Sequence, residues 1–230
     1  MRAAIVGAGP LRGGRALAAR LRRADLVISA NGGLRAVRRL GVRPHVALGD
    51  FDSASAALLV WARRRGAEII RHPAEKDQTD AEIALDHALA RGAREIEIFG
   101  ALGGRVDHLL ANVGLLLRGA RGVRISGRRR RARVRIVDGG VELFLAERRT
   151  PLAGRPGDLV SLLPLTRRVS GVHIQGVKYP LRDAVLVEGS SLGVSNEIVA
   201  RRAWVGVRSG DLLVVCTSRP ARRAASRAGV

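Results

Sequence analysis

Asp50 and Asp52 stand on one short turn, GDFDS (49–53), directly after an apolar run. Two carboxylates this close repel each other, so they need a counter-charge from a neighbouring base, a metal ion or shared protons. Further carboxylates occur in two later loops, EKDQTDAE (75–82) and GALGGRVDH (100–108). Mg²⁺ prefers oxygen ligands and is usually held by one or two carboxylates plus substrate phosphates. If the three loops meet in space, they therefore predict a site for a divalent cation.

The loop 100–108 also carries groups that can hold phosphate. Gly103 and Gly104 have no side chain, so backbone N–H groups can approach an anion there, and Arg105 adds a fork of donors. Asp107 follows at the start of the next expected helix. Phosphate donors beside a carboxylate are what a metal–nucleotide site requires, which favours Mg²⁺ with a polyphosphate as the missing counter-charge.

The loop 75–82 leads into another expected helix. Thr79 and Glu82 have the spacing of a capping box, which predicts Thr79 as the N-cap and Asp80 in the first turn. Complementing the helix dipole would by itself explain Asp80. Asp77 precedes the helix and has no such structural reason, so a functional role for this loop is the preferred hypothesis.

These loops need a scaffold that brings them together, and the first half of the chain predicts one. Short apolar runs alternate with helical patterns, and strands are expected at 3–9, 26–30, 45–49, 67–71 and 94–100. This alternation predicts an α/β fold with a mostly parallel, doubly wound sheet covered by helices on both faces. Ligands of such sheets collect beyond the carboxyl ends of the strands, where all three loops fall.

The pattern changes after about residue 120, where short apolar runs are separated by glycine and polar turns and no convincing helix remains. This predicts a C-terminal antiparallel β-sandwich or barrel. We expect an α/β domain over 1–125, a β-sandwich over 126–218 and a disordered tail over 219–230. The arginine-rich stretch 127–140 near the boundary is expected to be a solvated loop that leads into a strand.

The composition limits the alternatives. The formal net charge is +21, but all except two of the 41 basic residues are arginine, and they are spread along the whole chain. Aromatic residues make up only 3%, which leaves few rings to stack on bases. No apolar stretch approaches the ~20 residues needed to span a bilayer, and the N-terminus is expected to be a strand rather than a signal peptide. The single cysteine, Cys216, fits a reducing cytoplasm.

In their order and spacing, the three loops and the turn NGG (31–33) resemble the thiamin pyrophosphokinase family. The resemblance continues through SLLPLT (161–166), GVKYPL (176–181) and GSSLGVSNE (189–197). It implies an enzyme that transfers diphosphate from ATP to the hydroxyl of thiamin, giving thiamin diphosphate and AMP. It also implies a homodimer that binds thiamin at the subunit interface.

The resemblance further implies roles for particular residues. The implied acidic Mg²⁺–ATP cluster consists of Asp50, Asp52, Asp80 and Asp107. The implied nucleotide and phosphate contacts are Asn31, Gly32, Gly33, Gly103, Gly104 and Arg105. The implied substrate neighbours are Gln78, Thr79, Ser195 and Asn196, of which the last two would bind thiamin. Asp52, Asp80, Asp107 and Arg105 would be catalytic, and either Asp80 or Asp107 would accept the alcohol proton.

Two positions depart from the pattern of that family. The family commonly has Asp before the paired glycines, where this chain has Asn31. An amide can offer an oxygen but brings no negative charge, so Asn31 is not expected to be a direct metal ligand. The family also commonly has an acidic residue where this chain has His45, a position we expect to be peripheral.

Two other functions fit parts of the sequence. The same scaffold could transfer diphosphate to another small alcohol such as a pterin, which the intact stretch 189–197 disfavours. A basic nucleic-acid-binding protein without catalysis would show steeply salt-dependent binding, but it gives no reason for three aspartate loops.

Overall fold

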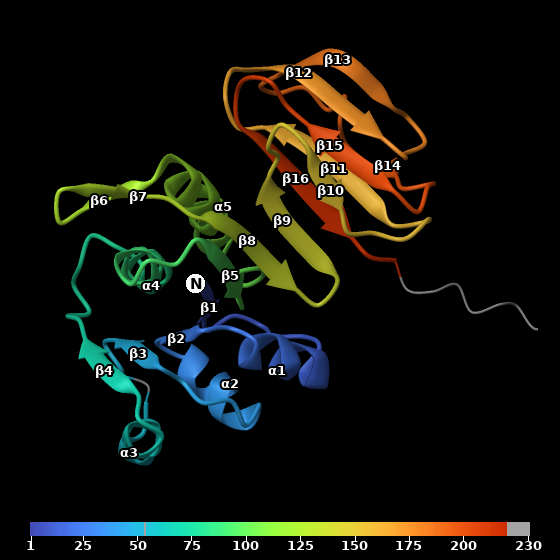
Figure 1. The fold of residues 1–230 in the computed structure, drawn as a ribbon. Helices are drawn as coiled ribbons and strands as arrows, with labels where there is room; N and C mark the ends of the chain where they lie inside the picture. The colour runs from blue at the N-terminus through green and yellow to red at the C-terminus, as the bar shows by residue number, and fades with distance from the viewer. Residues whose placement is uncertain (53, 220–230) are drawn as a thin grey trace, which may run out of the picture. The chain divides into compact units, whose positions relative to one another are not determined.

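The computed structural model describes residues 1–52 and 54–219. It divides into two compact units, Met1–Leu145 and Ala146–Val230 (Figure 1). Apart from its first residue, the expected disordered tail over 219–230 lies outside the described residues.

Parallel strands and one antiparallel strand form the sheet of the first unit. Its strands are β1 (Arg2–Val6), β2 (Leu26–Ala30), β3 (Val46–Gly49), β4 (Glu68–Arg71), β5 (Glu95–Phe99), β8 (Arg133–Asp138) and β9 (Val141–Leu145). They lie in the order β9-β8-β5-β1-β2-β3-β4, and every pairing is parallel except that of β8 with β9. The predicted mostly parallel sheet is confirmed.

The first unit extends further along the chain than the expected boundary at residue 125. β8 pairs in parallel with β5, from Glu95 opposite Arg133 to Phe99 opposite Val137, and β9 returns beside it. The segment 126–145, expected in the second domain, therefore lies in the first unit. A short alternating strand has the same sequence pattern whether it extends a parallel sheet or begins an antiparallel one, so the pattern alone could not place this boundary.

Helices cover both faces of this sheet. They are α1 (Gly14–Arg22), α2 (Gly33–Arg39), α3 (Ala56–Arg64), α4 (Asp80–Ala90) and α5 (Val106–Arg121). Leu17 and Leu21 of α1 and Val37 of α2 share one buried cluster with Val6 of β1 and Val27 of β2. Figure 1 shows α4 and α5 on the opposite side of the sheet from α1 and α2. Covered on both faces, every residue of β2 is buried, as the doubly wound arrangement requires.

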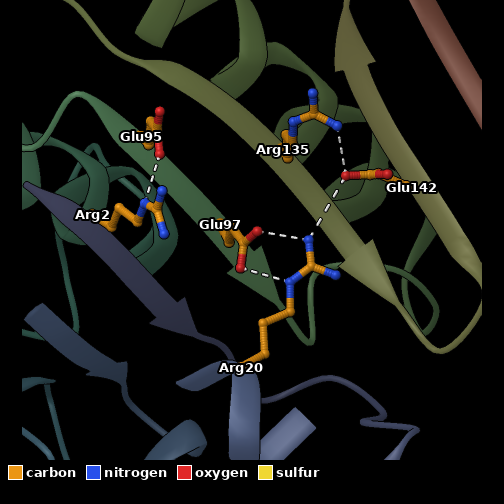
Figure 2. Close-up of polar contacts among 6 residues, drawn as sticks. All are labelled: Arg2, Arg20, Glu95, Glu97, Arg135 and Glu142. Atoms are coloured by element: carbon orange, nitrogen blue, oxygen red, sulfur yellow. Dashed lines mark hydrogen bonds and ion pairs between the residues drawn. The ribbon is translucent and has the colours of Figure 1, made fainter. Parts of the chain in front are cut away.

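A polar network ties α1 to the sheet across β5 and β9 (Figure 2). Arg20 donates two hydrogen bonds to Glu97, from Nε at 2.8 Å and from Nη2 at 2.6 Å. Arg20 Nη2 also lies 3.8 Å from Glu142 Oε1, which accepts a 2.8 Å bond from Arg135 Nη1. The hydrogen bonds to Glu97 raise the pKa of the Arg20 guanidinium above its ordinary value. The network therefore helps to hold β9 beside β8.

We expect Arg20→Met to lower the free energy of unfolding by about 1 kcal/mol, because the side chain is partly exposed and solvent screens part of the attraction. Arg2→Met is the matched control, since the Arg2–Glu95 pair is a single contact between side chains that are 69% and 52% exposed. Its loss is expected to cost less than about 0.5 kcal/mol. Urea unfolding followed by circular dichroism measures both. Equal effects of the two substitutions would contradict a special role for the network.

The first residues of the arginine-rich stretch form the turn and the second strand of a hairpin. The expectation of a loop is therefore wrong for these residues. β6 (Val123–Ile125) and β7 (Arg128–Arg130) pair antiparallel. Ser126 and Gly127 connect them with φ values of 47° and 75°. Two successive left-handed residues are what a type I′ hairpin turn requires, and such a turn allows strands of three residues that are too short to show periodicity.

The second unit is built from antiparallel strands, as predicted, and its described residues form no helix. The strands are β10 (Thr150–Leu152), β11 (Leu159–Pro164), β12 (Arg168–Gln175), β13 (Leu181–Val187), β14 (Asn196–Glu197), β15 (Ala203–Gly206) and β16 (Leu212–Thr217). Within the unit they form the orders β14-β11-β16 and β10-β15-β12-β13. In the described part of the chain, no helix has the length and apolar character of a membrane span.

Candidate active site

The loops that carry the predicted site residues follow β2, β3, β4 and β5, at the carboxyl edge of the parallel sheet. The turn after β2 is joined directly to the end of β3, because the Asn31 N–H donates to the Leu48 carbonyl at 2.7 Å. Asn31 has φ 45°, in the left-handed region that Asn tolerates better than most residues. This conformation ends β2 and turns the chain towards α2.

Asn31 joins two of the predicted carboxylates. Its Nδ2 donates to Asp50 Oδ1 at 3.0 Å and to Asp80 Oδ2 at 3.3 Å. Its Oδ1 is buried without a hydrogen-bond partner. A neutral amide offers two donors at this point, whereas a carboxylate would add a third negative charge. The residue that was not expected to act directly therefore lies at the centre of the acidic site.

Asp80 has a second partner in Lys76, on the loop before α4. Lys76 Nζ forms an ion pair with Asp80 Oδ1 at 2.9 Å, without hydrogen-bond geometry, and donates to the Pro73 carbonyl at 3.1 Å. Both side chains of the ion pair are largely buried, with 17% and 24% exposed. Thr79 caps α4 as predicted, and its hydroxyl accepts from the Glu82 N–H at 3.2 Å. Asp80 is thus held by specific contacts in addition to the helix dipole.

The turn after β3 has a strained backbone. Phe51 is buried, 4% exposed, and has φ 61°, an unusual conformation for a bulky residue that is often found at functional sites. Arg71, at the end of β4, lies over its ring at 5.4 Å. Asp50 Oδ1 accepts from the Asp52 N–H at 3.1 Å, while Asp52 itself is exposed. Sequence reasoning missed Arg71, although its place at the end of a strand beside β3 was a usable signal.

In the loop after β5, the charged side chains of Arg105 and Asp107 pair with each other. Arg105 Nη2 and Nε lie 2.5 and 3.1 Å from the two carboxylate oxygens of Asp107. This hydrogen bonding, followed by that of the His108 N–H, lowers the pKa of Asp107 to about 2. Gly103 and Gly104 are exposed and have φ values of 91° and 77°, as expected for a glycine turn. Asp107 is therefore paired with Arg105, apart from the Asp50–Asp80 pair.

The glycines of the NGG turn serve packing. A Cβ on Gly33 would lie 1.9 Å from the Val6 carbonyl oxygen, and one on Gly32 would lie 2.9 Å from the Ala8 Cβ. These contacts show that the turn after β2 packs directly on the turn after β1. A phosphate contact at either glycine stays a prediction.

Gln78 belongs to a polar cluster between α4 and α5. Its Nε2 donates to Glu82 Oε1 at 3.0 Å and to Asp86 Oδ2 at 3.3 Å. Arg118 of α5 binds the same two carboxylates, with Nη2 2.6 Å from Asp86 Oδ2 and Nη1 3.1 Å from Glu82 Oε1. The amide predicted to lie beside substrate is thus engaged by these acidic side chains.

The two predicted thiamin contacts lie in the second unit and differ from each other. Asn196 is buried and clamps Tyr179: its Nδ2 donates to the Tyr179 carbonyl at 2.6 Å, and its Oδ1 accepts from the Tyr179 N–H at 3.0 Å. Ser195 is exposed with φ 62°, and its N–H donates to Ser161 Oγ at 3.0 Å. The structural contribution of Asn196 was missed by sequence reasoning, whereas the Ser195 side chain faces solvent.

The predicted quartet of carboxylates is not assembled as one set. Asp50 and Asp80 are joined through Asn31, Asp52 is exposed and Asp107 is paired with Arg105. Accordingly, residues 1–52 and 54–219 contain no group of three or more His, Cys, Asp or Glu side chains placed to hold a metal ion. The two carboxylates that the structure does bring together are those of Asp50 and Asp80, which meet at Asn31 Nδ2.

Two other features lie at the opposite, amino-terminal edge of the sheet. An open cavity of about 460 Å³ is lined by Met1, Arg2, Arg23, Asp25, Arg94 and Glu95. At the start of β3, His45 Nδ1 accepts from the Val27 N–H at 2.9 Å, and burial lowers the pKa of His45. Both are remote from the carboxyl-edge loops and are not assigned to the site.

Two family models match the chain: the catalytic domain of thiamin pyrophosphokinase over residues 17–126 and its vitamin B1 binding domain over 149–212. Thiamine pyrophosphokinase of Bacillus subtilis is 30% identical over 177 residues, covering 76% of this chain and 79% of that protein.

Solved structures agree with these matches. That of the Bacillus subtilis thiamine pyrophosphokinase has a TM-score of 0.82 at 26% identity, covering 96% of this chain and 100% of that one. That of a thiamin pyrophosphokinase from Geobacillus thermodenitrificans has a TM-score of 0.76 at 32% identity, covering 96% and 99%. With both halves matched and the acidic loops in place at the carboxyl edge, the chain belongs to the thiamin pyrophosphokinase family.

Proposed function

We propose that this protein transfers a diphosphate group from ATP to the hydroxyl of thiamin, giving thiamin diphosphate and AMP. Family membership supports the reaction, and one structural observation supports its location. Carboxylates from the loops after β3 and β4 are brought to a single amide, Asn31, at the carboxyl edge of a parallel sheet, where ligands of such sheets bind.

We propose Mg²⁺ as the metal of this site. The ligands fit, because Asp50, Asp80 and the unpartnered Asn31 Oδ1 are all oxygen donors of the kind that Mg²⁺ prefers. Asp50 and Asp80 would hold the ion, with Asp52 and Asp107 as further ligands if their loops move. When bound, the ion would neutralise negative charge on the phosphates.

The remaining work falls to residues of the chain. The reaction needs the alcohol to be aligned in line with the β-phosphorus and charge on the phosphates to be stabilised. The exposed turn at Gly103 and Gly104 offers backbone N–H groups for phosphate, and Arg105 would exchange Asp107 for a phosphate oxygen. Asp107 has a pKa of about 2 while it is paired with Arg105 and is then a weak proton acceptor at neutral pH. It would become a better acceptor once Arg105 has moved to the phosphate, so both Asp80 and Asp107 are proposed as candidates for the base.

Thiamin would bind at Ser195, in a cytoplasmic homodimer whose second copy covers this part of the second unit. Support comes from exposed apolar side chains just before Ser195 in the sequence and at Tyr179, which is hydrogen-bonded to the neighbouring Asn196. Leu192 is 64% exposed and Val194 is 44% exposed, and Tyr179, clamped by Asn196, is 62% exposed. Exposed apolar side chains grouped in this way are typical of surfaces that bind a partner or ligand.

The test is to incubate the purified chain with ATP, Mg²⁺ and thiamin and to follow AMP and thiamin diphosphate by chromatography. We expect the two products in equal amounts, no ADP, and loss of both when EDTA removes the divalent ion. A pterin alcohol serves as the competing acceptor. Release of ADP, or faster transfer to the pterin, would contradict the proposal.

A further inference from the structure

Lys76 is unusual in this chain, because lysine occurs only at positions 76 and 178 among 41 basic residues. Its side chain is only 17% exposed, and its Nζ is shared between Asp80 Oδ1 and the Pro73 carbonyl. Lysine carries a compact charge with three donors on a flexible stem, whereas arginine has a planar fork suited to a fixed two-pronged contact. A lysine can therefore exchange one oxygen partner for another without a demand for planar geometry.

Two basic side chains lie at the acidic pair. Lys76 forms an ion pair with Asp80, and Arg71 Nη1 lies 3.5 Å from the Asp50 carbonyl oxygen, while Asn31 supplies a neutral link to both carboxylates. Lys76 is thus the cation that contacts a carboxylate oxygen of the pair, which helps the two carboxylates to lie together in the folded protein.

A divalent cation held by the Asp80 carboxylate would lie close to Lys76. The ammonium lies 2.9 Å from Asp80 Oδ1, while Asp80 Oδ2 is the oxygen that is linked through Asn31 to Asp50. A cation on either oxygen would be repelled by the ammonium at such short range. The segment between β4 and α4 contains no helix or strand, and Pro73, which holds the ammonium, is exposed. Lys76 could therefore change partner by rotation of its own side chain, while Thr79 keeps the start of α4 in place.

We propose that Lys76 is the resident counter-ion of the acidic pair, that a divalent cation displaces it from Asp80, and that it then binds the phosphates of the nucleotide. The last step rests on the proposed function, whereas the displacement does not. In this scheme Lys76 first neutralises the Asp80 carboxylate in place of the metal. After the metal has bound, Lys76 neutralises negative charge on the phosphates.

Amine acylation of the wild-type protein tests the proposal directly, because the two lysines and the N-terminus are its only amines and each acetylated peptide can be assigned separately. A short pulse of acetic anhydride, read by mass spectrometry, is applied in EDTA, with Mn²⁺ alone, and with Mg²⁺ plus α,β-methylene-ATP. We expect Mn²⁺ alone to raise acetylation of Lys76 several-fold and the nucleotide analogue to lower it again. Lys178, which lies over the Tyr179 ring at 5.5 Å in the second unit, is the internal control. An unchanged Lys76 signal with Mn²⁺ would overturn the displacement.

Metal binding by variants gives a second readout without nucleotide. Lys76→Met is expected to bind Mn²⁺ about tenfold more tightly than wild type, since removal of a neighbouring like charge favours the bound cation. Lys76→Arg keeps the charge and should not gain affinity, and Lys178→Met should match wild type. Electron paramagnetic resonance of free Mn²⁺ measures all four proteins. Equal affinities for Lys76→Met and wild type would count against the proposal.

The outcomes separate this inference from the proposed function. If Lys76 responds to Mn²⁺ but thiamin diphosphate is not made, the displacement stands and the assigned reaction fails. If thiamin diphosphate is made and Lys76 does not respond, the reaction stands and the counter-ion role is rejected.

Discussion

Asp80→Asn is expected to lower kcat for thiamin diphosphate formation by about 10²–10³-fold, the usual cost of losing one key charge-stabilising contact. The substitution keeps the shape of the side chain but removes the charge that Lys76 and Asn31 now satisfy. It also removes one of the two proposed proton acceptors. The fold should persist, because Thr79 still caps α4. Steady-state rates at saturating ATP and Mg²⁺, together with a thermal melt, measure both effects.

Asp25→Asn is the matched control for this prediction. Asp25 precedes β2 at the opposite edge of the sheet, where its Oδ2 accepts from the Arg2 N–H at 2.8 Å. The same change of charge there is expected to leave kcat within about twofold, since exposed charges this far away are screened. Near-normal turnover in Asp80→Asn, or an equal loss in Asp25→Asn, would rule out the assigned site.

Gly33→Ala is expected to lower the free energy of unfolding by about 2–4 kcal/mol. The added Cβ would lie 1.9 Å from the Val6 carbonyl oxygen and 2.7 Å from the Val6 carbonyl carbon. Both are backbone atoms of β1, so no change of rotamer relieves the clash, and α2 must move away from the sheet. Because Asn31 stands two residues earlier, activity should fall as well. Thermal unfolding should show a decrease of about 5–15 °C for a chain of this size.

Gly114→Ala is the matched control, because it makes the same substitution at a position with room for a Cβ. Gly114 lies within α5, and a Cβ there would meet nothing within 4 Å. Alanine is a better helix former than glycine, so this variant is expected to be more stable by about 0.5–1 kcal/mol. A Gly33→Ala protein as stable as wild type would show that the two turns do not pack as closely as described.

The fold class was predictable because strands buried on both faces appear in the sequence as short apolar runs. The apolar runs of β1, β2 and β3 and the helical patterns between them reflect a sheet covered on both faces. The membership of β8 and β9 was not predictable in the same way. Their pattern of alternation is shared by parallel and antiparallel neighbours, and only the register of β8 against β5 decides between them.

Local signals at the site were also predictable. The spacing of Thr79 and Glu82 predicted the start of α4, and the cap is confirmed by the Thr79 hydroxyl. Such a signal depends on residues within one turn of helix, whose separation is set by the chain itself. The placement of acidic loops after successive strands follows from the same local reasoning, because strand ends can be located without knowledge of their neighbours.

By itself, the sequence of this protein determined which residue types stand at the ends of which strands, and therefore the family, the fold class and the edge of the sheet that carries the site. Only the tertiary structure decided the partners of the charges: Asn31 between Asp50 and Asp80, Lys76 on Asp80, and Arg105 on Asp107. Residue types and strand ends are local properties, whereas the Asn31 bonds require side chains from separate loops to lie within about 3–4 Å, a distance set by how the strands and helices beneath the loops pack. Lys76 and Asp80, and Arg105 and Asp107, are close in sequence, but the conformation of each loop decides whether the two side chains face each other.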